Sequence, residues 1–480
     1  MNLFRRKSVS DLQDEAKTNN SLHRALGPWH LVFLGIGCTI GGGIFVLTGH
    51  VAANTAGPAV VLSYALAGFA SIFAALCYSE FASLVPMSGS AYTYSYVTLG
   101  ELLAWIIGWD LILEYAVGGM TVAIAWSGNA VKLLKSFNIV LPPQLTAATG
   151  ASVTLANGDT VSAWFNLPAV VIVFLVTTLL VLGIRESARF NNVIVFVKLA
   201  VIVVFIVGSI SAINTANWHP FIPPATADGH FGWGGVQAGA GTVFFAYVGF
   251  DAVSTAAQES RNPQRDMPFG IIGSLIVCTI LYLLVAAIAT GVVPYKELGG
   301  DAPIVYAAEK AGMHEWISIA INVGIVAGLS SVIMVLLMGQ SRVFWSMSRD
   351  GLLPPFVNKV HPRFKTPWIT SIITGAVVAA LSATLTLSIA GDLCSIGTLL
   401  AFVIVCISVL VLRIREPHHV RTFRVAGLWF VAPAGALSAL YLMMGLGLYT
   451  WLRLIGWFVI GMVIYFFYSN RNSRLALKQP

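Results

Sequence analysis

The sequence predicts an all-α membrane protein with twelve transmembrane helices, of which the first and the sixth are broken inside the bilayer. Three observations support this prediction. The 480-residue chain is 57% hydrophobic and only 10% charged, with a mean hydropathy of +0.82, whereas soluble domains keep a larger charged shell. Twelve apolar stretches approach the ~20 residues that cross a bilayer core. Two of these stretches carry glycine interruptions at corresponding positions.

The twelve predicted spans set the topology of the chain. They are residues 29–53, 59–82, 98–128, 165–183, 191–213, 235–258, 268–293, 315–345, 366–388, 393–413, 428–449 and 453–469. Placing both ends of the chain in the cytoplasm satisfies the positive-inside rule, because the outside loops then contain few basic residues. Those residues are Lys132, Lys135, Lys296, Lys310 and Arg453. The other Lys and Arg residues fall inside, except Lys198, which lies within a span.

Several classes of function are disfavoured by composition and motifs. The net charge of +7 does not indicate a nucleic-acid partner, since the basic residues are scattered through short loops. All five cysteines lie in apolar runs without CxxC spacing, so we expect no disulfide, metal or cofactor. No HExxH or GxSxG motif stands in a span, which argues against an enzyme. A channel would require a filter or rings of charge, which the sequence does not show.

The first span contains GIGCTIGGGIF, in which Gly41, Gly42 and Gly43 are consecutive. Glycine costs ~1 kcal/mol relative to alanine in a helix interior, and unwound backbone in a membrane must be buried in protein or line a wet cavity. The sixth span, GTVFFAYVGFDAV, has Gly249 in its middle. Five spans separate the two starts, so the broken helices enter the membrane in opposite directions, which is typical of inverted-repeat transporters. Close helix packing by small residues is the alternative explanation.

Unwound segments predict a zwitterionic ligand. The half-helix that follows a break presents free amides at its positive end, and the half-helix before it presents free carbonyls. We expect the amides to bind a carboxylate and the carbonyls to bind an ammonium group, which together describe an α-amino acid. Phe245 is the aromatic side chain expected to cover the ligand. The candidate residues at the two breaks are Cys38, Ile40, Gly41, Gly42, Gly43, Ile44, Phe244, Phe245, Ala246, Tyr247 and Gly249.

Five stretches resemble the amino acid–polyamine–organocation superfamily, and within it the cationic amino acid transporter family with its bacterial members. They are GIGCTIGGGIFVLTG, PMSGSAYTYSY, GWDLILEY, FFAYVGFDAVSTAAQESRNPQRDMP and SRDGLLPP. The resemblance covers essentially the whole chain. It implies a secondary transporter of L-amino acids in the plasma (inner) membrane, with a five-plus-five, leucine-transporter-like inverted repeat. Relatives usually have IGTGIF where this chain has IGGGIF, so Gly42 replaces a threonine.

The resemblance also divides the chain into segments. A cytoplasmic segment, 1–28, precedes the first repeat, 29–213, and the second repeat is 235–413. Two trailing helices occupy 428–469, and a cytoplasmic tail occupies 470–480. The expected partners are the amino acid, protons and membrane lipid. No protein partner can be named from the sequence.

Lys198 is a cation inside the fifth span, and an intramembrane charge is by default a functional hypothesis. Burial disfavours its charged form, which suits a proton carrier; the alternative is that it snorkels to the interface. The resemblance implies that its ammonium replaces a sodium ion that bridges helices 1, 5 and 8 in relatives. Ser330 and Ser331 are candidates to hydrogen-bond this ammonium or, alternatively, to bind sodium. We expect proton symport, with exchange, sodium coupling and amino-acid sensing as alternatives.

Specificity is expected to depend on the third and eighth spans. Glu114, one helical turn after Asp110, is expected to favour a cationic side chain or to hold water below the site. Gly118 and Leu336 are expected to line the side-chain pocket, where bulky apolar neighbours would favour neutral substrates. Glu80 and Glu101, near the ends of spans, are expected to be ordinary boundary residues.

Overall fold

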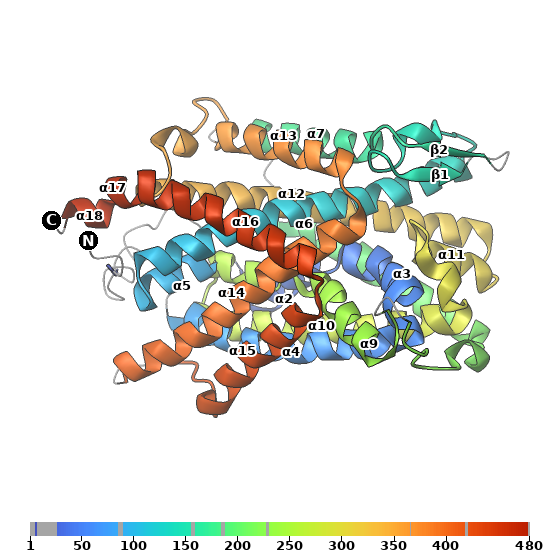
Figure 1. Ribbon diagram of the computed structural model, residues 1–480, viewed down its shortest axis with the longest axis horizontal. Coiled ribbons are helices and arrows are strands. Elements are labelled where there is room, and N and C mark those ends of the chain that lie inside the picture. The colour runs from blue at the N-terminus through green and yellow to red at the C-terminus, as the bar shows by residue number, and fades with distance from the viewer. Residues whose placement is uncertain are drawn as a thin grey trace.

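The computed structural model describes residues 5–6, 26–84, 90–154, 159–183, 188–226, 230–364, 366–417 and 421–478. Most of the expected cytoplasmic segment 1–28 lies outside the described residues. Helices dominate, and most run along the long axis of the molecule (Figure 1). Both ends of the chain lie at one end of this axis, and a small β-hairpin lies at the other.

Helices occur in every stretch expected to cross the membrane. They are α2 (Pro28–Thr39), η1 (Gly43–Leu47), α3 (Thr48–Val51), η2 (Ala52–Ala56), α4 (Val60–Leu84), α6 (Glu101–Ser136), α7 (Leu167–Leu182), α8 (Ala188–Ser209), α9 (Gly232–Val243), η7 (Phe244–Tyr247), η8 (Asp251–Glu259), α10 (Pro263–Val292), α12 (Glu315–Arg349), α13 (Trp368–Thr384), α14 (Leu387–Arg415), α15 (Leu428–Gly445), α16 (Leu448–Ile464) and η11 (Tyr465–Ser469). Within the described residues, nine helical segments are long and apolar enough to cross a membrane. The apolar helices α2, α7 and α13 are shorter, so the count of twelve spans stays a prediction.

Shorter elements connect these helices. They are η3 (Gly57–Ala59), α5 (Ser90–Thr98), η4 (Pro143–Leu145), β1 (Ser152–Thr154), β2 (Thr160–Ser162), η5 (Ile210–Ala212), η6 (Thr215–Trp218), η9 (Tyr295–Gly299), α11 (Pro303–Lys310), η10 (Pro355–Asn358), α17 (Asn470–Asn472) and α18 (Arg474–Lys478). Strands β1 and β2 pair antiparallel, with Val153 opposite Val161. The hairpin lies in the loop that the sequence predicts between the third and fourth spans.

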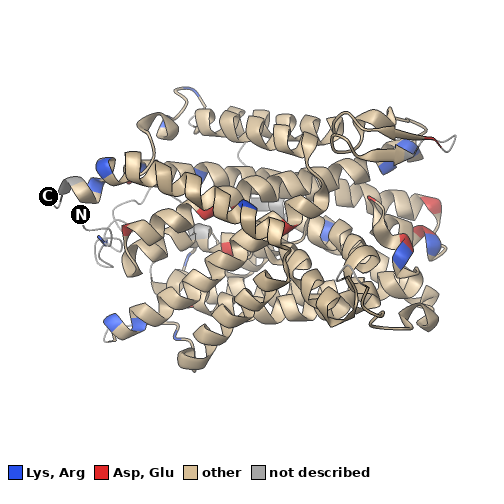
Figure 2. Cartoon of the chain, in the orientation of Figure 1, with Lys and Arg blue, Asp and Glu red and all other residues tan. Residues whose placement is uncertain are grey.

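The core lies between helices that are distant in sequence. Helix α6 packs along α12 and α14, α4 packs along α10, and α2 packs on α10 and α8. Helices α7 and α13 lie side by side at one edge (Figure 1). Charged residues gather toward the two ends of the bundle, and few lie between them (Figure 2). This distribution is the one expected when the middle of the molecule lies in hydrocarbon.

Helix α5 differs from the prediction, which begins a span at residue 98. It is a separate helix, and α6 begins after Gly100, whose φ of +106° lies in a region that favours glycine. Tyr92, Tyr94 and Tyr96 of α5 are all buried by protein. A hydropathy pattern does not detect such a helix, because its side chains are polar-aromatic and its burial comes from tertiary contacts.

Candidate functional site

The first span is interrupted where its glycines are consecutive. Helix α2 ends at Thr39, and Ile40 leaves the helix with φ −74° and ψ 101°. A second helical segment, η1, begins at Gly43. The first amides of a helical segment have no partner within it. The amide of Ile40 still donates to the Ile36 oxygen at 2.9 Å, so it is the backbone from Gly41 to Ile44 that presents N–H groups in the interior of the bundle.

The sixth span is interrupted as well. Helix α9 ends at Val243, the tighter segment η7 follows, and Val248 adopts an extended conformation. Gly249 has φ +108°, which a residue with a side chain rarely adopts. The chain then turns into η8.

The two breaks contact each other directly. A Cβ atom placed on Gly43 would lie 2.4 Å from the Cα of Ala246, and one on Gly249 would lie 3.0 Å from the carbonyl oxygen of Cys38. Only glycine permits backbone contacts this close. The structure therefore brings together the residues that the sequence predicts from two separate spans.

Three buried tyrosines form a cluster at the breaks, and two of them, Tyr64 and Tyr282, donate to carbonyls there. The Tyr282 hydroxyl lies 2.7 Å from the Ala246 oxygen and 3.0 Å from the Thr39 oxygen, so its single proton is shared between the two breaks. The Tyr64 hydroxyl donates to the main-chain oxygen of Gly43 at 3.0 Å, and the Tyr247 hydroxyl donates to the main-chain oxygen of Tyr64 at 3.0 Å. Adjacent rings lie with centroids 5.3 to 5.5 Å apart.

This tyrosine cluster was not predicted. The signal available in the sequence was a tyrosine in each of three otherwise apolar spans, but their partners are backbone atoms that no residue pattern reveals. The Ala246 carbonyl, which was expected to bind the substrate ammonium, already accepts a hydrogen bond from the Tyr282 hydroxyl. A carbonyl oxygen has a second lone pair, so this bond orients the group without exhausting it.

Replacing Tyr282 with phenylalanine is expected to impair transport, because the backbone at the two breaks loses the hydroxyl that positions it. The change leaves two buried carbonyls without their donor, which costs roughly 1–3 kcal/mol. We expect a lower melting temperature and a raised KM in uptake assays. Tyr306→Phe is the matched control, since its hydroxyl donates to Glu297 at the end of the bundle opposite the chain termini (Figure 1). Equal behaviour of the two variants would show that Tyr282 has no positioning role.

The side chains around the break in the first span are apolar. A Cβ on Gly42 would lie 3.1 Å from the Ala125 methyl group and 3.8 Å from the Phe245 ring. Gly41 faces Val332 of α12 at 3.5 Å. In this part of the site the polar groups are those of the backbone, and the side chains around them are apolar.

Gly118 and Leu336 also meet, as the sequence predicts. A Cβ on Gly118 would lie 3.4 Å from Leu336 and 3.5 Å from the Cys394 thiol of α14. Cys394 in turn donates to the main-chain oxygen of Glu114 at 3.5 Å. Leucine and cysteine side chains thus surround the position that glycine leaves open.

Two carboxylates of α6 are buried near these residues. Asp110 and Glu114 are each 1% exposed. Both oxygens of Asp110 and the Oε1 of Glu114 have no hydrogen-bond partner within the described part of the chain. The Asp110 Oδ1 atom faces Gly397 of α14. Buried carboxyl groups in such surroundings are stable when protonated, hydrated or bound to a cation.

Lys198 is fully buried, and its ammonium donates to the main-chain oxygen of Gly37 at 2.7 Å. Its stem lies on Gly328 of α12, where an added Cβ would come within 2.9 Å of the lysine Cγ. The side chain therefore bridges α8, α2 and α12. It does not snorkel to the interface.

The two serines of α12 have defined partners. Ser331 donates to the Gly328 oxygen at 2.9 Å, within the turn that carries the Lys198 stem. Ser330 donates a hydrogen bond to the Val326 oxygen and accepts one from the Trp126 indole N–H, each at 2.9 Å. Their proposed part in coupling stays a prediction. Among the residues that the structure describes, no group of three His, Cys, Asp or Glu residues could hold a metal ion.

Broken helices that meet inside a bundle of apolar helices, with free backbone amides between apolar side chains, form the site of a membrane transport protein. The chain belongs to the amino acid permease family, whose model matches residues 26–473. The proteins of this family are transporters and not enzymes.

The chain is similar along nearly its whole length to two proteins of Bacillus subtilis (strain 168). It is 46% identical over 474 residues to the branched-chain amino acid permease BcaP, covering 98% of this chain and 99% of that protein. It is also 46% identical over 473 residues to the methylthioribose transporter, with the same coverage. It is 40% identical over 418 residues to cationic amino acid transporter 2, vacuolar, of Arabidopsis thaliana, covering 87% of this chain and 64% of that protein.

Proposed function

We propose that this permease carries neutral, aliphatic L-amino acids across the plasma membrane of a bacterium, with both termini in the cytoplasm. The observation that carries the proposal is the apolar surround of the first break, formed by Ala125, Phe245 and Val332. The free amides of Gly42 to Ile44 would bind the carboxylate, and hydrocarbon would accept the substrate side chain. The similarity to a branched-chain amino acid permease supports the same substrate class.

Transport would proceed by alternating access between two inverted repeats, 29–213 and 235–413, with the trailing helices 428–469 outside them. The two interrupted spans are the first element of each repeat. Their contact at Gly43 and Ala246 supports a substrate position between the two repeats.

We infer proton coupling from the position of Lys198. Its ammonium occupies a site between α2, α8 and α12 and bonds a carbonyl next to the break. Loss of the proton would remove this charge-assisted bond. The strength of the contact between α8 and α2 would then depend on whether Lys198 is protonated. Proton binding at Lys198 would in this way be linked to the substrate site. Sodium coupling and exchange are the alternatives.

A second candidate substrate is methylthioribose, because a relative that transports it is as similar to this chain as the amino acid permease is. A thioether methyl group would suit the same apolar surround. The unwound backbone favours the amino acid, since its amides and carbonyls complement a carboxylate and an ammonium group.

Competition against bound radiolabelled leucine tests the substrate class. With all twenty amino acids and methylthioribose as competitors, we expect leucine, isoleucine and valine to displace the label at least tenfold better than arginine or lysine. Displacement by methylthioribose with none by isoleucine or valine would favour the sugar. Stronger displacement by arginine would assign the dominant role to Glu114.

Counterflow in proteoliposomes separates a transporter from a sensor. We expect labelled leucine to accumulate against a preloaded unlabelled pool. Intact binding without accumulation would show a sensor and contradict the proposal.

A further inference from the structure

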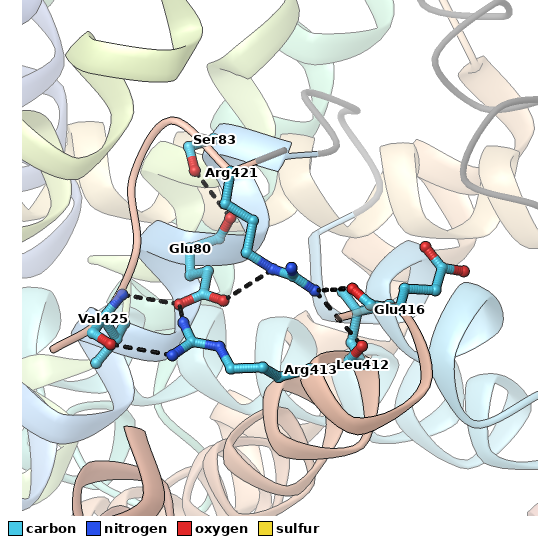
Figure 3. Close-up of polar contacts among 7 residues, drawn as sticks. All are labelled: Glu80, Ser83, Leu412, Arg413, Glu416, Arg421 and Val425. Carbon is cyan, nitrogen blue, oxygen red and sulfur yellow. Dashed lines mark hydrogen bonds and ion pairs between the residues drawn. The ribbon is translucent and has the colours of Figure 1, made fainter. Parts of the chain in front are cut away.

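A buried ion cluster lies near the end of α4 (Figure 3). The Glu80 side chain, 3% exposed, pairs with Arg413 of α14 and with Arg421 Nε at 3.3 Å. The amide of Val425 donates to the same carboxylate at 2.8 Å, and Arg413 donates to the Val425 oxygen at 3.2 Å. These bonds fasten residues 421–427, which precede α15, onto α4.

Positive charge is in excess in this cluster. Glu80 pairs with two guanidinium groups, the exposed Arg424 lies near enough to act on Arg421, and Glu416 is the second carboxylate nearby, so these three arginines outnumber the two carboxylates. Burial lowers the pKa of Arg421; Glu80 and, less strongly, Glu416 oppose this effect, and the neighbouring Arg413 and Arg424 add to it. Arg421 donates to the main-chain oxygen of Glu416 at 2.9 Å, while the Glu416 carboxylate points away from Glu80 (Figure 3). A bound anion would therefore stabilise the cluster.

Exposed aromatic rings continue from the arginines along α4 and α15. Trp429 and Phe430, at the start of α15, are 66% and 71% exposed. The Phe430 ring meets Phe73 of α4 with centroids 6.4 Å apart, and Phe73 meets Phe69, which is 58% exposed.

The depth of these rings follows from the helix. Phe73 precedes Glu80 by seven residues of α4, about 10 Å along the axis. The rings thus lie at acyl-chain depth when the arginines lie at the level of the phosphates.

We propose that Arg424, backed by Arg421 and Arg413, binds the phosphate of an anionic phospholipid whose acyl chains pack on Phe69, Trp429 and Phe430. Guanidinium groups bind phosphate through charge-assisted hydrogen bonds. A zwitterionic lipid brings its own cation and leaves the excess charge in place. The bound lipid holds residues 421–427 against α4.

Lipid binding to purified protein in detergent tests this proposal. Native mass spectrometry counts retained phosphatidylglycerol or phosphatidylcholine, and the melting temperature is recorded with each lipid. We expect phosphatidylglycerol, and not phosphatidylcholine, to bind and to raise the melting temperature. Arg424→Ala is expected to weaken this binding roughly fivefold, since one basic residue contributes ~1 kcal/mol. Arg424→Lys should retain most of it.

Arg471→Ala, at another exposed arginine, is the matched control and should behave as the parent protein. Three results would overturn the proposal. Phosphatidylglycerol would stabilise Arg424→Ala as much as the parent, phosphatidylcholine would stabilise the parent equally, or inorganic phosphate alone would reproduce the effect. The test measures lipid retention and melting temperature, so it does not depend on transport activity or on the proposed substrate.

Discussion

Replacing Lys198 with methionine is expected to abolish proton-driven accumulation of substrate and leave the protein folded. The methionine stem can still lie on Gly328, while the donor to the Gly37 oxygen is lost. With one proton per substrate, each unit of pH gradient contributes ~1.4 kcal/mol, or about tenfold accumulation. The variant should therefore lose about tenfold accumulation per unit of imposed gradient and still exchange substrate.

Uptake into proteoliposomes with an imposed pH gradient, together with substrate-induced acidification of the lumen, measures this effect. Lys310→Met, at the exposed end of α11, is the control and should retain coupling. Lys198→Ala removes the stem as well and should lower the melting temperature further than Lys198→Met does, because it adds a cavity to the unsatisfied carbonyl that both variants share. Sodium-stimulated, pH-insensitive uptake by Lys198→Ala would contradict the idea that this lysine carries the coupling proton.

Introducing threonine at Gly42 is expected to weaken leucine binding by about tenfold or more. The new Cβ would lie 3.1 Å from the Ala125 methyl group, which is too close unless one of the two moves, whereas the Phe245 ring and the Val122 Cα, each 3.8 Å away, are at ordinary contact distance. Overpacking of this kind costs ~1–3 kcal/mol. Ala125→Gly alone should have a small effect, and it should restore binding when combined with Gly42→Thr.

The four proteins of this cycle are compared by the dissociation constant for leucine and by melting temperature. Recovery in the double variant measures the coupling between positions 42 and 125. Gly456→Ala in α16 is the control, since its Cβ would come within 4 Å of no neighbouring atom in the described part of the chain. If Gly42→Thr binds leucine as tightly as the parent does, Ala125 is not what excludes threonine. Tighter binding by the double variant would show that the hydroxyl contacts the carboxylate.

Local signals in the sequence predicted where the two interrupted spans approach each other. Consecutive glycines at 41–43 and Gly249 mark positions where backbone must approach backbone, and the structure places such contacts there. Lys198 was also identified, because a lone cation in an apolar run has few explanations. These features depend on residue type within one short stretch.

Contacts between residues far apart in the sequence could not be predicted from such local signals. Glu80 was expected to be a boundary residue, yet it binds Arg413, which is 333 positions away. Glu101 was expected to be similar, yet it accepts a hydrogen bond from Tyr96 at 3.0 Å and another from Ser473, near the other end of the chain. Periodicity and hydropathy describe how a segment meets the membrane. They do not say which distant side chain completes a buried charge.

The contact of Gly43 with Ala246 affects how substrate binding energy can be used. Because the two interrupted spans are already fastened to each other and to Tyr282, the ligand is not required to hold them together. Its interactions are then available to distinguish one conformation of the carrier from another, and only such differences can shift a conformational equilibrium. A rigid site of this kind lets a small molecule with few polar atoms drive a large rearrangement.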